Sequence, residues 1–450
     1  MRRGIVLIIF AAISACSADN GVTTPAPGTK IRHVIIIMQE NRSFDTYFGT
    51  FPGADGIPMQ DELPRDCLPD PVHNTCIYPY HDTADVNVGG PHAAPDAVAD
   101  IDGGNMDGFV ARALRVKATC VTAQDPSCHG GTDVMGYHDD HEIPNYWAYA
   151  QNFVLQDRLF EAAATWSLPA HLFMVSAWSA SCEIDQPMTC RNALQSPAGG
   201  IPVGGAWIPA KSGAYAWTDI TYLLHKAGIS WKYYVANGSQ PDCDDDGAKC
   251  PAVPQNSATP SIWNPLPSFT TVRIDGELGN IQDLENFYED AKQSRLPQVA
   301  WIVPNQKDGE HPPAKVSDGE KYVTGVINAI MQSPQWDSTA IFLSWDDWGG
   351  FYDHVVPPKI DENGYGIRVP GLVISPYAKQ GYIDHQLLSH DAYLKFIEDV
   401  FLANRRIDPR TDGRPDPRPT VRESVRLLGD LQNDFDFTQP PRAPMILPPR

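Results

Sequence analysis

The feature that most constrains the fold is a repeated succession of a helix-like segment and a short, continuous apolar run. Amphipathic stretches at residues 219–227, 281–294 and 320–332 precede the apolar runs "ISWKYYV", "QVAWIV" and "AIFLSW". Runs that are apolar at every position are typical of strands buried on both faces, as in parallel sheets covered by helices. The succession therefore predicts an α/β fold with a mostly parallel central sheet flanked by helices.

Other segments extend this pattern toward both ends of the chain. Val34 to Met38 is a further strand candidate, and "GLVISP" is another. The segment "SHDAYLKFIEDVFLA" predicts an amphipathic helix with Ser389 as its cap. The chain has 450 residues and 42% hydrophobic content, enough to bury a large core.

Long irregular stretches interrupt the sheet pattern at about residues 50–140, 180–215 and 238–275. They are too long for simple connections between helices and strands, so we expect them to form a cap over one sheet edge. The main domain is predicted to span residues 31–435. Residues 436–450 are Pro-rich and are predicted to form a poorly ordered tail.

The first residues predict export. Two arginines precede an apolar run from Ile5 to Ile13, which is too short to span a bilayer and is typical of a signal peptide. The following "SAC" resembles a lipoprotein cleavage box and predicts a signal peptide over residues 1–15 with Cys16 lipidated. Residues 16–30 would then tether a membrane-anchored lipoprotein, periplasmic or on the cell surface. Ordinary cleavage with an incidental cysteine is the alternative.

The remaining cysteines are consistent with an exported protein. Apart from Cys16, eight of the nine cysteines form four close pairs: Cys67 and Cys76, Cys120 and Cys128, Cys182 and Cys190, Cys243 and Cys250. An even number, local pairing and an export signal together predict four disulfides that clip the irregular insertions. A zinc site is the alternative, but no pair has the two-residue spacing of a zinc knuckle.

The charge of the chain excludes some partners. The formal net charge is -21, which argues against a nucleic-acid ligand because phosphate backbones require a basic surface. The same charge argues against broad electrostatic adhesion to anionic lipid, so membrane contact would depend on Cys16. No feature of the sequence implies a protein partner.

Polar side chains follow two of the predicted strands. Glu40 and Asn41 come after the first apolar run, and Asp346 and Asp347 come after "AIFLSW". In a parallel α/β sheet, ligands bind beyond the carboxyl ends of the strands. Three carboxylates and an amide gathered there would repel one another without a divalent cation, and oxygen ligands suit calcium, magnesium or manganese better than zinc. Capping of helix N-termini by the acids is the alternative.

Ser167 is a candidate nucleophile. It directly precedes Leu168, Pro169 and a helical apolar run, which is also the pattern of an ordinary N-cap. The N–H groups at a helix start attract phosphate, and an adjacent metal lowers the pKa of a hydroxyl. Three histidines in Gly/Pro-rich loops could bind phosphate oxygens or protonate a leaving alkoxide: His92, His311 and His354. A single loop histidine is more often merely solvated, so both interpretations stay open.

The motifs together are similar to the bacterial phospholipase C and acid phosphatase family. The shared segments, in order, are "HVIIIMQENRSFDTYFGTFPGADG", "GGNMDGFV", "TWSLPAHLF", "EHPP", "WDDWGGFYDHVVPP" and "SHDAYLKFIEDVF". The resemblance extends over about residues 31–435 and implies a fold like that of alkaline phosphatases and sulfatases. Ala170 and His171 stand where the family usually has Asn and a basic residue, and Asp347 stands where some members carry Glu.

The resemblance implies a role for each candidate residue. Glu40, Asn41, Asp346 and Asp347 would hold one divalent metal. Ser167 would be the metal-activated nucleophile that becomes phosphorylated. The three candidate histidines, His92, His311 and His354, would bind the phosphoryl group or assist the leaving group.

The function implied is that of an exported, metal-dependent phosphoric ester hydrolase, a phospholipase C-type phosphodiesterase acting on a small phosphate ester or a phospholipid. An acid phosphatase on the same scaffold is the first alternative, and a catalytically inactive surface binding protein is the second. A calcium-binding structural module is a third, suggested by the acidic segment "DCDDDGAKC".

Overall fold

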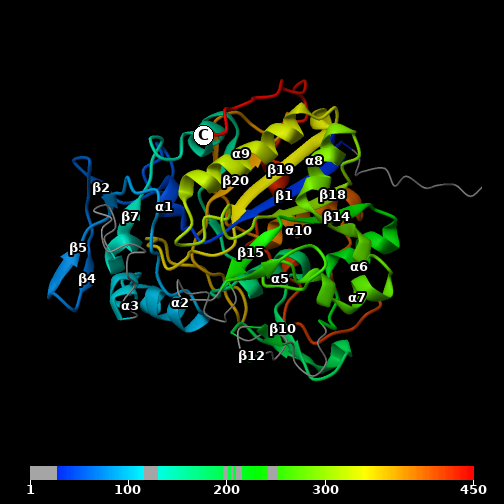
Figure 1. Ribbon diagram of the computed structural model, residues 1–450, viewed down its shortest axis with the longest axis horizontal. Helices are drawn as coiled ribbons and strands as arrows, with labels where there is room; N and C mark the ends of the chain where they lie inside the picture. The colour runs from blue at the N-terminus through cyan, green and yellow to red at the C-terminus, as the bar shows by residue number, and fades with distance from the viewer. Residues whose placement is uncertain (1–27, 116–129, 196–200, 204–205, 209–214, 242–251) are drawn as a thin grey trace, which may run out of the picture.

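The core of the molecule is an eight-stranded sheet (Figure 1). The computed structural model describes residues 28–115, 130–195, 201–203, 206–208, 215–241 and 252–450. Across the sheet the strands are β17 (Ile281–Asp283), β14 (Trp231–Val235), β18 (Val299–Val303), β1 (His33–Gln39), β19 (Thr339–Trp345), β20 (Gly371–Ile374), β8 (Val154–Gln156) and β21 (Tyr382–Asp384).

The sheet is mostly parallel, as predicted. Only β20 runs antiparallel to its neighbours β19 and β8, and the other neighbouring strands pair in parallel. β1 lies in the middle, with Val34 opposite Val299 on one side and Ala340 on the other. β18 and β19 are buried along their whole length, which explains their continuous apolar sequences. The direction of β20 was not predictable, because a doubly buried strand has the same composition in either orientation.

Helices cover both faces of the sheet. One layer contains α4 (Pro144–Asn152), α8 (Leu284–Lys292) and α9 (Val316–Gln332), in which α9 packs against the other two. The other layer contains α5 (Ser167–Ser176), α6 (Ile220–Ala227) and α10 (Asp391–Phe401), in which α5 packs against the other two. In Figure 1, α8 and α9 lie above the sheet and α5, α6 and α10 lie below it. The predicted helix-flanked architecture is therefore confirmed.

Local signals set both ends of α6, whereas two other predicted helix starts differ from the structure. Asp219 caps α6 by accepting a hydrogen bond from the Thr221 N–H, and Gly228 ends it in the left-handed conformation. The helix predicted from residue 281 is wrong over its first three residues, which pair with β14 as β17. The cap of α10 is His390 rather than Ser389, although the Ser389 hydroxyl accepts the N–H of Asp391.

Smaller elements lie in the irregular stretches and in the connections around the main sheet. These are α1 (Phe44–Phe48), β2 (Met59–Gln60), β3 (Leu63–Pro64), β4 (Leu68–Asp70), β5 (Thr75–Ile77), β6 (Tyr80–His81), α2 (Ala94–Ile101), α3 (Phe109–Arg115), β7 (Gly136–Tyr137), β9 (Leu159–Phe160), β10 (Ala180–Cys182), β11 (Cys190–Asn192), β12 (Ile201–Val203), β13 (Ala206–Ile208), β15 (Gly238–Pro241), β16 (Ala252–Gln255), α7 (Thr270–Ile274) and β22 (Leu388–Ser389).

The first of these insertions packs over the carboxyl end of β19. Gly90 N–H donates to the Gly349 carbonyl at 2.9 Å, and the Trp348 indole donates to Asp100 at 3.0 Å. The side chains of α2 and α3 form a separate apolar cluster that includes Trp348. The insertion therefore forms a wall beside the edge of the sheet at which ligands bind in α/β folds.

Two of the four predicted disulfides lie in the described part of the chain, and both are present. Cys67–Cys76 clips the hairpin of β4 and β5, and Cys182–Cys190 joins β10 to β11. The other predicted pairs, Cys120 with Cys128 and Cys243 with Cys250, lie outside the described residues, as do Cys16 and the acidic segment at 242–250. Within the described ranges, no helix combines the length and apolar character needed to cross a bilayer.

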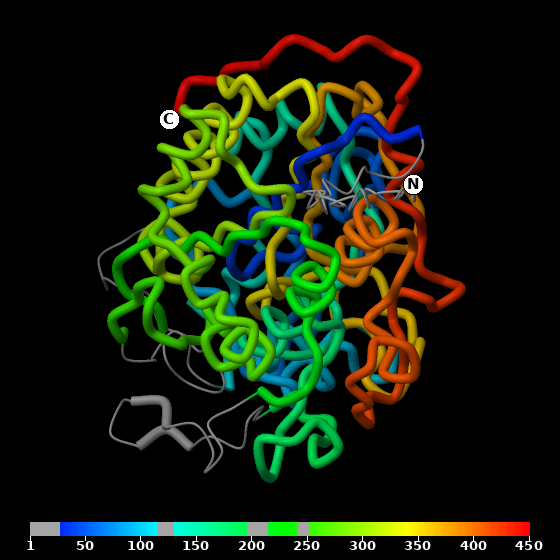
Figure 2. The backbone as a smooth tube through the Cα atoms, turned by 90° about the vertical axis from the view of Figure 1, so that its right-hand side faces the viewer, coloured from blue at the N-terminus to red at the C-terminus, as the bar shows by residue number. Residues whose placement is uncertain are grey.

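The Pro-rich end of the chain differs from the poorly ordered tail that we expected. It contains no helix or strand, but donors on the main domain hold its carbonyl groups. The Trp336 indole donates to the Arg442 carbonyl at 2.9 Å and Asn328 donates to the Leu447 carbonyl at 2.7 Å. Figure 2 shows this tail, in red, running along the outside of the molecule. Pairing of this kind depends on residues distant in sequence, which local composition does not reveal.

Candidate active site

The polar residues that follow β1 and β19 lie side by side. The two strands are parallel neighbours, and their last residues, Gln39 and Trp345, are opposite each other. The next residues of both strands therefore emerge at the same edge of the sheet: Glu40, Asn41, Asp346 and Asp347. All four side chains are fully buried. The structure thus brings together the four residues that the sequence indicates as metal ligands.

Hydrogen bonds fix the orientation of three of these residues. Asp346 Oδ1 accepts the backbone N–H groups of Asn41 at 3.0 Å and of Asp347 at 2.8 Å. Asn41 Nδ2 donates to Asp347 Oδ1 at 2.7 Å. Asn41 has a φ of 59°, a left-handed conformation that Asn tolerates better than most residues. These bonds leave Asp346 Oδ2 and Asn41 Oδ1 buried without a hydrogen-bond partner among the described residues.

A pair of glycines allows the loop after β19 to approach this edge closely. Gly349 and Gly350 have φ angles of 63° and 75°. A Cβ atom on Gly349 would lie 2.7 Å from the Asn41 carbonyl oxygen, and one on Gly350 would lie 2.4 Å from Gly90 Cα. Only glycine provides both the conformation and the space. The "WGG" sequence therefore holds Asp347 against Asn41.

Ser167 faces this group of oxygen atoms. It is the first residue of α5, and Trp166 rather than Ser167 is the N-cap. The Ser167 hydroxyl lies 3.2 Å from Asp347 Oδ2 and 3.4 Å from Glu40 Oε2. The side chain is fully buried. The hydroxyl is thus positioned between two carboxylates at the positive end of a helix.

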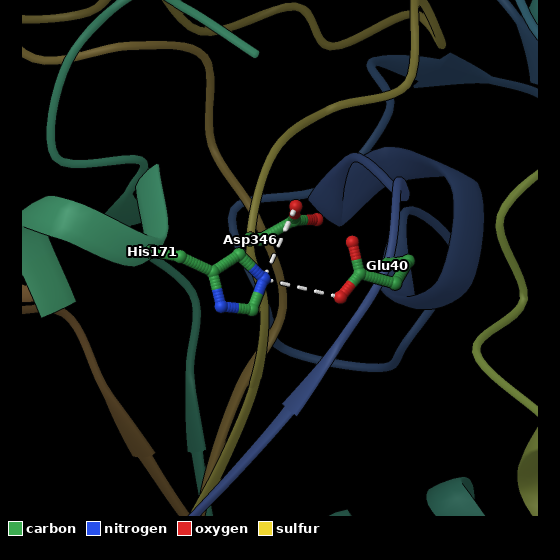
Figure 3. A group of neighbouring side chains, drawn as sticks. All are labelled: Glu40, His171 and Asp346. Atoms are coloured by element: carbon green, nitrogen blue, oxygen red, sulfur yellow. Dashed lines mark hydrogen bonds and ion pairs between the residues drawn. The ribbon is translucent and has the colours of Figure 1, made fainter. Parts of the chain in front are cut away.

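His171 also reaches the group, from one turn further along α5. Its Nε2 atom lies 3.2 Å from Glu40 Oε1 and 3.8 Å from Asp346 Oδ2 (Figure 3). In the sequence, His171 stands out only as a departure from the family pattern, and it is not among the predicted site residues. The signal that could have found it is the spacing of four residues from Ser167, which places both side chains on one helix face.

Two of the three predicted histidines lie together beside this group. The rings of His92 and His311 are 5.7 Å apart, and His92 is 6.2 Å from the ring of Trp348, which follows Asp347 in the chain. His92 Nδ1 faces the Gly90 carbonyl and His311 Nδ1 faces the Pro312 carbonyl, at 2.8 and 2.7 Å. Because a carbonyl oxygen only accepts hydrogen bonds, these contacts place a proton on Nδ1 of each ring.

The third predicted histidine belongs to a different group. His354 Nδ1 lies 2.7 Å from Asp45 Oδ2 and 3.3 Å from Arg368 Nη2, and its other nitrogen lies 3.5 Å from Asp55. The contacts of His354 are therefore with these acidic and basic residues, and its role in the reaction stays a prediction. Burial lowers the pKa of His354, but the charge and hydrogen bond of Asp45 outweigh burial and raise the pKa above its ordinary value.

The raised pKa of His354 gives a testable pH dependence. The native state binds this proton more tightly than the unfolded state, so the interaction stabilises the fold fully below the unfolded pKa of 6.5. The stabilisation is lost as the pH rises through the raised native pKa. We expect His354→Asn to lower the urea midpoint more at about pH 5 than at about pH 9. An equal loss at both pH values would contradict the assignment.

The buried charge around Ser167 is strongly negative. Glu40, Asp346 and Asp347 have no exposed surface, and Arg42, also buried, donates to the Asn41 carbonyl rather than to these carboxylates. Burial raises the pKa of the nearby Glu161 well above its ordinary value, and the charge of Asp347 raises it further. Several carboxylates gathered in a buried site are costly unless a positive charge compensates them. The donor set, with two oxygens that accept no hydrogen bond from the described residues, therefore fits a divalent cation.

A second buried network supports the loop that carries His311. The Glu310 carboxylate accepts hydrogen bonds from Tyr47 and Tyr146, both at 2.6 Å, and from the Trp345 indole at 2.9 Å. Burial raises the pKa of Glu310, and the charge of Arg42 and these hydrogen bonds only partly oppose that effect. Glu310 thereby links the His311 loop to the end of β19. No local sequence signal identifies this role.

We expect Glu310→Gln to destabilise the fold by about 3 kcal/mol. The glutamine amide has only one acceptor oxygen, and its NH₂ group would face donors such as Tyr47, Tyr146 or Trp345. At least one of these buried donors would therefore lose its acceptor. Urea denaturation of the variant measures the loss. The matched control is Glu362→Gln, because Glu362 is exposed and its replacement should change stability by less than about 0.5 kcal/mol. Equal stability of the two variants would contradict the role of Glu310.

Comparison with known proteins gives consistent matches. Residues 31–403 match the model of the Phosphoesterase family. Non-hemolytic phospholipase C of Burkholderia pseudomallei is 28% identical over 465 residues, which cover 91% of this chain and 59% of that protein. Phospholipase C B of Mycobacterium tuberculosis is 26% identical, with 93% of this chain and 80% of that protein covered. The chain thus spans less than two thirds of the Burkholderia relative.

Solved structures give a weaker likeness. A protein in the alkaline phosphatase superfamily from Vibrio parahaemolyticus aligns with a TM-score of 0.38 and 12% identity, covering 83% of this chain and 68% of that one. The PsFucS1 sulfatase from Pseudoalteromonas sp. aligns with a TM-score of 0.36 and 10% identity, covering 92% and 74%. At these TM-scores the likeness supports no argument about this chain.

Proposed function

Because the chain belongs to the phosphoesterase family, we propose that it hydrolyses phosphoric esters, with a phospholipase C-type phosphodiester as substrate and Ser167 as nucleophile. The observation that carries this proposal is the position of the Ser167 hydroxyl between Asp347 and Glu40 at the start of α5. The choice of a phosphodiester is supported by the relatives, which are phospholipases C.

The proposal includes one divalent cation at the site. The residues that would hold it are Glu40, Asn41, Asp346 and Asp347. Its support is the buried negative charge and the two oxygens, Asn41 Oδ1 and Asp346 Oδ2, that accept no hydrogen bond from the described residues. When bound, such a cation supplies Lewis-acid stabilisation of phosphate charge and favours the ionised form of a serine hydroxyl.

The side chains of the protein perform the transfer steps. Hydrogen bonds to Asp347 and Glu40 orient the Ser167 hydroxyl, and the first N–H groups of α5 attract the phosphate. Ser167 Oγ passes its proton to Asp347 or Glu40, forms an oxygen–phosphorus bond and displaces the leaving alcohol. Protonated His92 or His311 gives a proton to the leaving alkoxide. Water then attacks the phosphoserine from the opposite side, which releases phosphate monoester and restores the serine.

The burial of the site adds a requirement. Ser167 and the acidic residues have no exposed surface, and His92 and His311 are 2% exposed. A substrate therefore reaches the serine only when side chains that cover it move. Exclusion of bulk water in the closed state would strengthen the electrostatic interactions of the site with the phosphate.

Two substrates offered in parallel test this function. The purified chain is supplied with a choline phosphodiester of the phospholipid type and with an aryl phosphate monoester, each with and without added divalent metal. Faster turnover of the diester supports the phospholipase C-type activity. Faster turnover of the monoester favours the acid phosphatase alternative. Turnover of neither substrate would overturn the proposal that the chain is a phosphoric ester hydrolase.

The proposal extends to location: an exported protein anchored through lipidated Cys16. Its support is the signal-like N-terminus and the two disulfides, which are typical of oxidising compartments. We expect the full chain to fractionate with membranes and the Cys16→Ala variant to fractionate as a secreted or periplasmic protein. Membrane association of both forms would contradict lipidation at Cys16.

A further inference from the structure

We propose that His171 is a ligand of the cation through Nε2, and that this nitrogen gives the site a preference for zinc over calcium. The inference deepens the proposed function and rests on the cation site that it contains. It adds a nitrogen donor to the set of oxygen donors that the sequence indicates. It also changes the expected identity of the metal, because the sequence alone favoured calcium, magnesium or manganese.

The first support is the geometry around a single nitrogen atom. His171 Nε2 faces Glu40 Oε1 at 3.2 Å and Asp346 Oδ2 at 3.8 Å (Figure 3). Two ligand atoms that each lie about 2.0–2.2 Å from one zinc ion are separated by at most about 4.4 Å. Both observed separations are below this limit. One ion can therefore contact the nitrogen and either carboxylate oxygen without large movements of the side chains.

The second support is a carboxylate oxygen of Asp346 that lacks a hydrogen bond within the described part of the chain. Asp346 Oδ1 accepts two backbone N–H groups, whereas Oδ2, the atom that faces His171, is buried and accepts no hydrogen bond from the described residues. If His171 only donated a hydrogen bond to Glu40, this oxygen of Asp346 would stay desolvated and unsatisfied. A cation shared by His171, Glu40 and Asp346 satisfies all three groups.

The third support is the helix that positions the histidine. Ser167 and His171 are four residues apart in α5 and point from the same face. Glu40 connects them, because its Oε2 lies near the Ser167 hydroxyl and its Oε1 lies near His171 Nε2. A rigid helix therefore holds the nucleophile and the nitrogen donor at a fixed spacing. Such positioning is what a metal site on a regular element provides.

The mixed ligand set determines the preferred metal. Imidazole nitrogen is a good ligand for zinc, iron, nickel and copper, whereas calcium and magnesium bind oxygen ligands. A site of oxygen atoms alone would not discriminate strongly against calcium. Addition of His171 Nε2 shifts the balance toward zinc. The substitution His171→Asn replaces the nitrogen by an amide and should largely remove this discrimination.

The binding experiment uses the full chain freed of metal and titrated separately with zinc and calcium by calorimetry. For the wild type we expect one tight zinc site and much weaker calcium binding. For His171→Asn we expect the zinc affinity to fall by on the order of a hundredfold and the calcium affinity to change by less than about tenfold. The matched control is His138→Asn, another fully buried histidine, whose Nε2 contacts Asn87. It should leave both affinities unchanged.

Unchanged zinc affinity in His171→Asn, or tighter binding of calcium than of zinc by the wild type, would overturn the inference. A protonated His171 that merely neutralises the carboxylates would give unchanged or tighter zinc binding in the variant, because its positive charge repels the cation, and either result would overturn the inference. If His171→Asn does not fold, X-ray absorption at the zinc edge of the wild type loaded with one equivalent decides the question. Scattering from an imidazole ring is expected, and its absence would refute the ligand.

These measurements are separate from catalysis. Tight zinc binding with an imidazole ligand in a protein that hydrolyses no phosphate ester would uphold the inference and overturn the proposed function. Hydrolysis of a phosphodiester by a protein whose zinc affinity does not depend on His171 would uphold the proposed function and overturn the inference.

Discussion

Replacement of Ser167 by alanine should lower the turnover of phosphate esters by at least about a thousandfold. The variant lacks the oxygen that forms the bond to phosphorus, and no other hydroxyl of α5 occupies its position between Asp347 and Glu40. The loss should appear in kcat, because the cation and the histidines that bind phosphate are retained. Steady-state kinetics with the better of the two test substrates measures the effect.

The control for this variant is Thr165→Val, two residues earlier in the same motif. Thr165 donates its hydroxyl to the Leu194 carbonyl at 2.7 Å, so its role is structural and most of the turnover should remain. The Ser167→Ala variant should unfold at nearly the wild-type temperature, since one small oxygen is removed. Full turnover in Ser167→Ala together with loss in Thr165→Val would show that the wrong residue has been assigned as nucleophile.

Exhaustive chelation should reduce turnover by at least about a hundredfold, and added divalent metal should restore it. Without a cation the three buried carboxylates around Ser167 repel a phosphate and one another. Chelated and reloaded samples of the same preparation provide the comparison, with metal content measured in each. Full turnover by protein shown to be free of metal would contradict the proposal that the buried acidic residues bind a cation needed for catalysis.

A matched variant separates the cation from general damage to the site. Asp346→Asn keeps an oxygen to accept the N–H groups of Asn41 and Asp347 but removes the charge of the atom that faces His171. We expect the fold to persist and a higher metal concentration to be needed for half-maximal activity. An unchanged metal requirement would exclude Asp346 from the ligands.

Much of this arrangement was predictable from the sequence, because strand position determines which side chains meet. Continuous apolar runs marked β1 and β19 as doubly buried strands. Neighbouring parallel strands end at one edge, so the polar residues after each strand, Glu40 to Asn41 and Asp346 to Asp347, lie together. Similarly, the amphipathic stretch at residues 219–227 predicted α6, whose ends are capped locally by Asp219 and Gly228.

Features that depend on contacts between distant segments were not predictable. His171 joins the acidic residues only because α5 packs with one face toward the ends of β1 and β19. Glu310 is a buried acceptor for Tyr47 and Tyr146, which come from two other parts of the chain. His354 lies in the motif that follows the acidic pair, yet its partners are Asp45, Asp55 and Arg368. In each case the partner, rather than the local pattern, determines the role.

The most direct test of the central claim, that a serine takes the phosphoryl group, is the stereochemical course at phosphorus. A phosphodiester that is chiral at phosphorus is hydrolysed in isotope-labelled water, and the configuration of the product is determined. Each in-line displacement inverts phosphorus, so transfer to Ser167 followed by attack of water should give net retention. Net inversion would mean that water attacks the substrate directly, which would contradict a phosphoserine intermediate.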